Sequence, residues 1–309
     1  MLAKKHNLIL PMIMMGLMLS FSMTSCNKDN DENPSPAMSK DIVETASSDN
    51  NFSTLVAALN KANLASTLKG DGPFTVFAPT NTAFSQLLSD LGFSSLDDVP
   101  VETLKSILLY HVVSGKILST DLKDGYISML STGPGGNYLS LLVDAKDVKL
   151  NASTNITQAN LDASNGVIHV IDKVLLPPTV VDIASENPDF SILVEAVVKA
   201  DLVNTLSGTG PFTIFAPTNE AFQNLFTSLG VSGISDLTKD QLTPILLHHV
   251  VSGNVRSTDL ASGSVATLNG DINVMVSSRV TIDSDVHVLA ADVQGSNGVI
   301  HVIDNVLLP

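Results

Sequence analysis

Four histidines lie within apolar stretches of this sequence, and histidine is the side chain that most often serves as a general base or as a nitrogen ligand for a metal. They are His111, His169, His249 and His301. Asp172 and Asp304 follow two of these histidines closely enough to orient an imidazole if the backbone turned between them. On one extended strand, however, residues an odd number of positions apart point to opposite faces. We therefore expect all six residues to be structural, hydrogen-bonded parts of the core, and we expect the chain not to be an enzyme.

Other residue patterns give no alternative chemistry. No Gly-x-Ser-x-Gly motif presents a serine nucleophile. The carboxylates of Asp97-Asp98 and Asp283-Ser284-Asp285 lack the glycine turn and closing glutamate of a calcium loop. Gly133-Pro134-Gly135-Gly136 lacks the Lys-Ser/Thr of a phosphate loop, so it predicts a hairpin turn. The sequence therefore predicts no metal site and no cofactor.

The single cysteine, Cys26, follows a basic start at Lys4-Lys5 and an apolar run from Leu8 to Met18. This order predicts a secretory signal peptide over residues 1–25. A permanent membrane helix is the weaker interpretation, because it needs roughly 20 apolar residues. The segment Met23-Thr24-Ser25-Cys26 resembles a bacterial lipobox of the relaxed kind found in Bacteroidetes, which implies that Cys26 is lipidated. The alternative is a buried free thiol.

Residues 26–38 are polar and contain Pro34-Ser35-Pro36, which predicts a flexible tether. Their lysine-and-acid pattern resembles the signal that sends Bacteroidetes lipoproteins to the outer face of the outer membrane, although a plain solvated linker explains it equally well. We expect an outer membrane lipoprotein that is exposed at the cell surface, with a periplasmic orientation as the alternative. The lipid would be its only contact with the membrane.

Charge and composition limit the other partners. The formal net charge is −15, and Arg256 and Arg279 are the only arginines. Binding to nucleic acid needs clustered basic side chains that release counterions from phosphates, so we expect no nucleic-acid partner. A chain of 309 residues with 44% hydrophobic residues is long enough for about two domains.

An internal repeat divides the chain. The stretch Pro73 to Asn81 recurs as Pro211 to Asn219, and His111-Val-Val-Ser-Gly115 recurs as His249 to Gly253. Ser164 to Asp172 recurs unchanged as Ser296 to Asp304, at a smaller offset, so the first copy carries an insertion that we place around the Gly133–Gly136 turn. We expect domains over residues 39–177 and 178–309.

Local patterns in each copy predict helices first and strands mostly afterwards, which is an α+β arrangement. Apolar residues from Phe52 to Leu68 recur at helical spacing. Phe74 to Phe77 predicts a short strand that Pro79 ends, followed by a helix capped by Thr80 or Asn81. A further helix should contain Leu104 to His111. Its counterpart has a capping box at Thr238 and Gln241, and Pro244 should kink or shorten it.

Three motifs in each copy, in one order, resemble the signatures of the fasciclin family. They are Phe-Thr-Val-Phe-Ala-Pro-Thr-Asn, Leu-Leu-Tyr-His-Val-Val-Ser-Gly and Asn-Gly-Val-Ile-His-Val-Ile-Asp with Leu-Leu-Pro. The resemblance covers residues from about 40 to 309. It implies two tandem domains, each a β-sandwich or wedge packed with several α-helices, and a role in extracellular adhesion or matrix association.

The resemblance also names candidate partner contacts, because some animal matrix members are credited with integrin binding through an Asp-Ile pair and a Tyr-His stretch. These positions align with Asn160-Leu161, Asp292-Val293, Tyr110-His111 and His248-His249. The first copy lacks the acid, the second lacks the tyrosine, and we do not transfer integrin binding. We expect non-catalytic binding of an unidentified protein or polysaccharide, with self-association left open. The alternative is a glycan- or small-ligand-binding lipoprotein of a nutrient-acquisition system.

Overall fold

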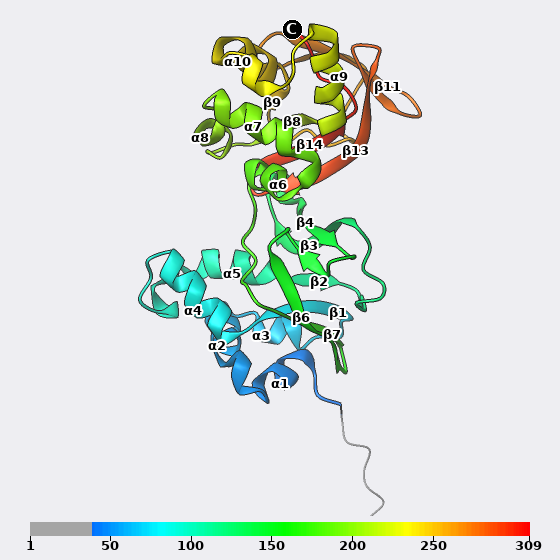
Figure 1. The fold of residues 1–309 in the computed structure, drawn as a ribbon. Helices are drawn as coiled ribbons and strands as arrows, with labels where there is room; N and C mark the ends of the chain where they lie inside the picture. Colours follow the sequence, from blue (N-terminus) through cyan, green and yellow to red (C-terminus); the bar gives the residue numbers. More distant parts are fainter. Residues whose placement is uncertain (1–38) are drawn as a thin grey trace, which may run out of the picture. The chain divides into compact units, whose positions relative to one another are not determined.

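The structure, a computed structural model, describes residues 39–309, which make up one unit of the chain (Figure 1). The predicted signal peptide, the tether and Cys26 lie outside the described residues. None of the helices in the described part is long and apolar enough to cross a membrane. The unit has its own hydrophobic cores, so we expect it to fold without the first 38 residues.

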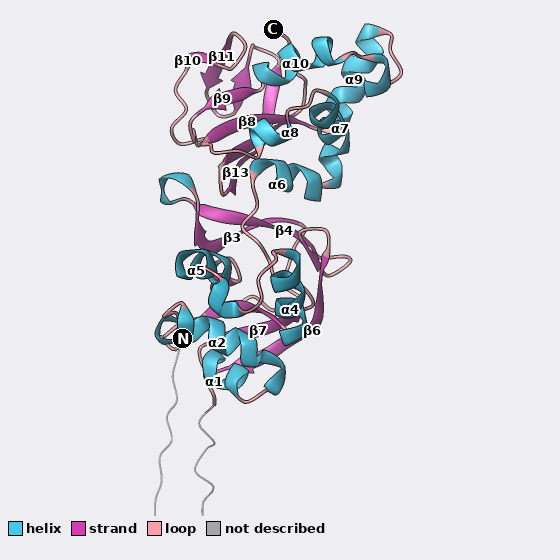
Figure 2. Cartoon of the chain, turned by 90° about the vertical axis from the view of Figure 1, so that its left-hand side faces the viewer, coloured by secondary structure: helices cyan, strands magenta, loops and turns pink. Residues whose placement is uncertain are grey.

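Each sequence copy forms one domain in which helices come first. The helices of the first domain are α1 (Ile42–Ser47), η1 (Asn50–Phe52), α2 (Ser53–Lys61), α3 (Ala65–Leu68), α4 (Asn81–Asp90), η2 (Leu96–Asp98), α5 (Val101–Leu109) and η3 (Pro134–Gly136). Those of the second are α6 (Val180–Glu186), η4 (Pro188–Phe190), α7 (Ser191–Lys199), α8 (Val203–Leu206), α9 (Asn219–Leu229), η5 (Ile234–Asp236) and α10 (Lys239–His248). Figure 2 shows them beside the strands of their own domain.

The strands of each domain form one seven-stranded sheet. The first sheet has the order β2-β1-β7-β6-β5-β4-β3, from β1 (Phe74–Pro79), β2 (Val112–Ser114), β3 (Gly125–Thr132), β4 (Tyr138–Asp144), β5 (Lys149–Leu150), β6 (Thr154–Ala163) and β7 (Gly166–Ile171). The second has the order β10-β11-β12-β13-β14-β8-β9, from β8 (Phe212–Pro217), β9 (Val250–Ser252), β10 (Gly263–Ala266), β11 (Asp271–Val276), β12 (Val280–Ile282), β13 (Val286–Gly295) and β14 (Gly298–Ile303).

Each sheet bends at one long strand. In the first domain, β6 shifts register against β7 at two places between Ile156 and Leu161, and β13 does the same against β14. Such bulges turn a strand and strengthen its twist. The central pair β1 and β7 is parallel, while the other pairs of that sheet are antiparallel.

Two hydrophobic clusters in each domain follow from this bend. One fills the space between the helices and the central strands and includes Phe52, Leu59 and Ile168 of the first domain. The other includes Phe77 and Leu141, from the two halves of the bent sheet. Strand β7 is buried along its whole length because it faces both clusters. The predicted α+β fold of two tandem domains, each a β-sandwich or wedge packed with several helices, is confirmed, and in each domain one seven-stranded sheet provides the strands.

Most predicted caps and turns are also confirmed. Thr80 caps α4 through the backbone N–H of Ala83, and Thr238 forms a capping box with Gln241. The helix around Leu104 ends at Leu109, so it stops short of His111. The strand at Phe74 runs through Pro79 instead of ending before it.

Two expectations about helices were wrong. The apolar run from Phe52 to Leu68 forms two helices, because Asn63 adopts a left-handed conformation (φ 55°) that Asn tolerates and that ends α2. Pro244 was expected to kink or shorten its helix, and the shortening is wrong because α10 continues to His248. The carbonyl that loses its partner there belongs to Asp240, which is exposed, so water can replace the missing N–H.

The insertion of the first copy lies in the β3–β4 hairpin, as expected from the Gly133–Gly136 turn. Ser128 pairs with Ser140 and, after a register shift, Thr132 pairs with Tyr138, so residues 129–139 extend this hairpin beyond the Ser128–Ser140 pair. In the second domain Ala266 pairs with Asp271, which leaves only residues 267–270. The longer hairpin of the first domain contacts β13 of the second domain.

Candidate functional site

His111 and His249 connect a helix end to the Leu-Leu-Pro segment of their domain. Nδ1 of His111 lies 2.8 Å from the carbonyl of Ile107, and its Nε2 accepts the N–H of Leu175 at 2.9 Å. His249 makes the same pair of contacts with Ile245 and Leu307. Because Nε2 accepts, the proton lies on Nδ1 of a neutral ring. Burial lowers the pKa of both rings to about 4, although the backbone carbonyl opposes this shift.

His169 and His301 use the opposite tautomer. Nε2 of His169 donates to the carbonyl of Ile117 at 2.9 Å, and Nδ1 accepts the N–H of Asn160 at 3.3 Å. His301 repeats this arrangement with Val255 and Asp292. Burial lowers the pKa of both rings. All four motif histidines are thus neutral and have both ring nitrogens occupied, which leaves no nitrogen free to act as a base.

Asp172 and Asp304 contact a neighbouring strand and not the motif histidines. Asp172 accepts the backbone and side-chain N–H groups of Asn155 at 2.8 and 2.6 Å. Asp304 accepts the N–H of His287 at 2.7 Å and lies 2.9 Å from its Nδ1. His287 is therefore the histidine that has an aspartate partner. Sequence reasoning missed it because the pair joins two strands, and only its alignment with Asn155 in the repeat could have indicated the contact.

Tyr110 and His248 occupy the same place in the two domains and are both buried. Tyr110 donates from its hydroxyl to the carbonyl of Ser140 at 2.7 Å. Burial raises the pKa of Tyr110. His248 lies 2.6 Å from the carbonyl of Asn269, in the corresponding hairpin. Neither side chain has exposed surface with which to touch a partner.

Asn160 and Asp292 lie at the bulges of β6 and β13, both in the left-handed conformation. Asn160 bonds the backbone and hydroxyl of Ser119, and Asp292 bonds those of Ser257 at 2.8 and 2.6 Å. Burial raises the pKa of Asp292, but the Ser257 bonds and the Arg256 charge outweigh it, so the net pKa is lowered. Of the residues after them, Leu161 is half-buried and Val293 is fully buried.

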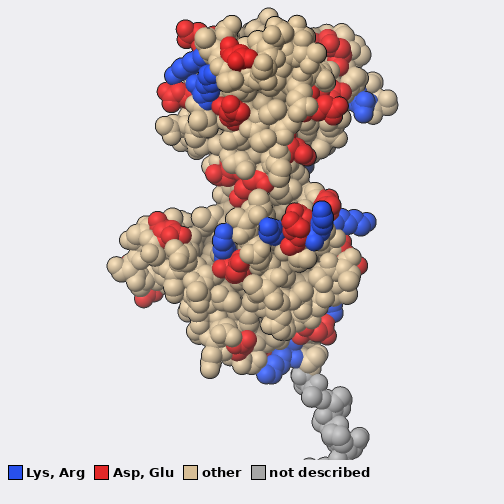
Figure 3. All heavy atoms as spheres, in the orientation of Figure 1, with Lys and Arg blue, Asp and Glu red and all other residues tan. Residues whose placement is uncertain are grey.

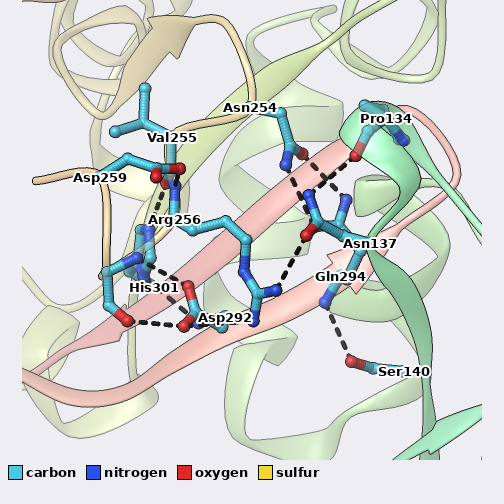
Figure 4. A network of polar contacts seen from close by, with 11 residues as sticks. Pro134, Asn137, Ser140, Asn254, Val255, Arg256, Asp259, Asp292, Gln294 and His301 are labelled. Carbon is cyan, nitrogen blue, oxygen red and sulfur yellow. Dashed lines mark hydrogen bonds and ion pairs between the residues drawn. The ribbon is translucent and has the colours of Figure 1, made fainter.

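A polar network joins the two domains at this point (Figure 4). Arg256 donates from Nη1 to Oδ1 of Asn137 at 2.9 Å, and its Nη2 lies 3.4 Å from Asp292. The backbone N–H of Gln294 donates to the hydroxyl of Ser140 at 2.9 Å. Asn137 and Ser140 belong to the long hairpin of the first domain, whereas Arg256, Asp292 and Gln294 belong to the second. The long hairpin therefore supplies the first domain's part of this polar network.

Two differences between the copies occur together in this network. Arg256 and Asp292 of the second domain correspond to Leu118 and Asn160 of the first, so the second domain has gained both members of an ion pair. This ion pair lies in the second domain, where Arg256 also contacts the long hairpin of the first domain. The acid that the family resemblance marks as a partner contact is thus engaged by Arg256.

Beside this network a groove of about 570 Å³ lies along the domain junction. The first domain contributes Tyr126 from β3, whose hydroxyl accepts a hydrogen bond from Asn187 Nδ2 of the second domain at 3.1 Å. Leu289, from β13, lines the groove with 53% of its surface exposed. The charged residues of the lining are Asp124, Asp144, Lys146 and Asp189.

The other surface features are weaker candidates for a binding site. On the face drawn in Figure 3, charged side chains form small separate groups over a largely uncharged surface. Among residues 39–309, no three or more His, Cys, Asp or Glu side chains gather where they could hold a metal ion. The junction groove is therefore the candidate functional site.

Comparison with known proteins gives several relatives. Protein sll1483 from Synechocystis is 47% identical over 137 residues, which cover 44% of this chain and 73% of the relative. Human periostin is 32% identical over 253 residues, covering 80% of this chain and 30% of periostin. Transforming growth factor-beta-induced protein ig-h3 from Sus scrofa is 31% identical over 247 residues, covering 78% of this chain and 35% of the relative. The chain thus spans about a third of the length of these two animal proteins.

A solved structure of a FAS1 domain pair, from the insect cell adhesion molecule Fasciclin I, is similar with 21% identity and a TM-score of 0.46. The similarity covers 82% of this chain and 92% of that one. The fasciclin domain model matches residues 50–177 and 188–309. These two segments follow the internal repeat and make up most of the chain, so the chain belongs to the fasciclin domain family.

Proposed function

We propose that this chain is a lipid-anchored adhesion or matrix-association protein, which binds its partner without catalysis through its pair of fasciclin domains. The proposal rests on the neutral charge and the hydrogen bonds of the four motif histidines. Four neutral histidines with both nitrogens occupied offer no base and no free ligand. Membership of the fasciclin family favours binding of a macromolecular surface as the remaining role.

The proposed binding surface is the junction groove. A binding site needs exposed apolar area that is fixed in place, and Leu289 supplies such area beside Tyr126. Residues from both domains line the groove, so its shape depends on the pair and not on either domain alone. Three aspartates against one lysine favour a partner surface that carries positive charge.

The anchor is proposed from the sequence around Cys26. A lipid on that cysteine would hold the domains at a membrane surface, with residues 26–38 as the spacer. We propose the outer face of the outer membrane as the location. Protease treatment of intact cells tests this: surface exposure predicts that the domains are cleaved, and that Cys26→Ala releases them from the cells. Protection from protease, while surface controls are cut, would instead place the domains in the periplasm.

An attachment assay tests the role itself. Cells that produce the full chain are compared with cells in which residues 40–309 are deleted, and attachment and biofilm cohesion are measured. We expect both to fall several-fold after deletion. Unchanged attachment would contradict the adhesion role. A saturable thermal shift with a soluble polysaccharide, in place of any attachment defect, would favour the nutrient-acquisition alternative.

A further inference from the structure

An apolar cavity of about 130 Å³ lies in the second domain, away from the junction groove. Helices α6, α7 and α8 form one side, and strands β8, β9 and β14 form the other. All but two of its lining residues are apolar, among them Val180, Val197, Val198, Val203, Ala216 and Ile300. An apolar cavity of similar size in an engineered protein, about 150 Å³, stays dry and binds benzene.

The two polar residues of the lining offer nothing to a ligand. The ring nitrogens of His249 are occupied by Ile245 and Leu307, as described above. The hydroxyl of Ser185 donates to the carbonyl of Val181 at 2.8 Å. A polar group placed inside would lose its water without gaining a partner. Ser185 is exposed at the edge of the lining, so the deep part of the cavity favours a hydrocarbon.

The lining reaches the surface on one side. Val198 is 60% exposed, and Val181, Val194 and Val203 are half-buried. The deepest residues, such as Ile300 and Ala216, are fully buried. A ligand can therefore enter past Val198 and leave one end in water, which fits an amphiphile.

The equivalent positions of the first domain carry different side chains at several places in this lining. Deep in the lining, Val180 and Val197 replace the larger Ile42 and Leu59. At the entrance, the apolar Val198 stands in the place of Asn60. Val203 and Ile214 of the lining are in turn larger than Ala65 and Val76, so the interior side chains are rearranged and not smaller in total. The change that favours an apolar ligand is the apolar surface that Val198 adds at the mouth.

We infer that this cavity binds the hydrocarbon end of a straight-chain amphiphile with an uncharged head group. The aliphatic lining fits an alkyl chain, and the volume fits a chain end about as bulky as a benzene ring. The net charge of −15 disfavours a carboxylate or phosphate head group. This binding is separate from the proposed adhesion role and uses a different surface.

Titration with 1-hexanol tests the inference, with residues 39–309 labelled at Val and Leu methyl groups and followed by NMR. We expect saturable shifts for methyls that line the cavity, including those of Val197 and Val203. Val197→Leu and Val180→Ile each restore a side chain of the first domain and should weaken binding at least tenfold while the protein stays folded. Because these two variants fill the cavity at separate positions, the test still works if one of them does not fold.

Leu59→Val is the matched control, since it makes the reverse change at the equivalent position of the first domain. It should leave the 1-hexanol affinity of the second domain unchanged. Shifts that do not saturate, or shifts that persist at full size in both filled variants, would overturn the inference.

Discussion

Arg256 of the second domain donates a hydrogen bond to Asn137 of the first, over 2.9 Å. Asn137 is available because the first copy carries a longer hairpin, and Arg256 is present where the first copy has Leu118. Two differences between otherwise similar repeats thus meet at one contact. The junction between the domains therefore depends on residues that distinguish the two copies.

The pair Arg256 and Asp292 should be energetically coupled. Arg256→Leu and Asp292→Asn introduce the residues of the first domain, and each alone leaves one partly buried charge without its partner. We expect each single variant to lower the free energy of unfolding by about 1 kcal/mol, and the double variant to lose less than the sum. Urea denaturation of the four proteins measures this. Strict additivity would contradict the coupling.

The hairpin should tolerate no side chain at Gly133. A Cβ atom there would lie 2.6 Å from the carbonyl oxygen of Gly295 in the other domain. Gly133→Ala should therefore separate the domains and increase tryptic cleavage after the exposed Lys173, in the segment that joins them. Gly233→Ala is the control, because Gly233 has extended backbone and open space around its Cα. Equal cleavage rates for the two variants would show that the contact is not tight in solution.

Acid should destabilise the domains through His111 and His249. Their pKa of about 4 lies below the ordinary 6.5, so the unfolded chain binds more protons between these two values. Stability is then complete above pH 6.5 and falls as the pH drops toward 4. His249→Gln should cost about 1–3 kcal/mol at pH 7 and make this fall shallower. Urea denaturation at several pH values measures both effects, and parallel profiles for the two proteins would contradict this prediction.

Glu186 should have the opposite pH dependence. Burial, with a contribution from Asp182, raises its pKa to about 8, so the folded state favours the protonated acid. Its stabilising effect is complete below the unfolded pKa of about 4.5 and is lost as the pH rises toward 8.

Glu186→Gln should therefore raise the free energy of unfolding at pH 9, on the order of 1 kcal/mol, and change it little at pH 4. Urea denaturation at the two pH values measures the difference. Glu195→Gln, on the exposed face of α7, serves as the control for removal of one charge. An equal gain in both variants at pH 9 would show that net charge is the cause.

The sequence predicted the parts of the fold that depend on local signals. The capping box at Thr238 and the turn at Gly133–Gly136 use residue types whose geometry is specific, so both were found. The break after Lys61 was missed because Asn63 is also compatible with a helix, and only its left-handed backbone ends α2. Helix α10 continues past Pro244 because water can bond the exposed carbonyl of Asp240. The spacing of apolar residues gives no information about that exposure.

The candidate site was harder to predict because it joins distant segments. The motif residues were visible in the sequence, yet Tyr110, His248 and Val293 lie in the core. The groove is lined in part by Tyr126, Asp189 and Leu289, which lie outside the repeated motifs, and also by Thr218 and Val302, which belong to them. Only the insertion in the first copy, in a sequence that otherwise repeats, indicated that the domains contact one another unequally.

Binding of a partner through the junction groove can be measured directly. Beads coated with residues 39–309 are allowed to attach to biofilm of the producing cells, and bound beads are counted. Leu289→Ser with Asp189→Lys alters the groove, and Leu229→Ser with Asp90→Lys makes the same changes elsewhere, at a leucine of similar exposure (50% against 53%). We predict at least a fivefold loss of attachment for the groove variant and none for the control, whereas equal attachment by both variants would contradict the account.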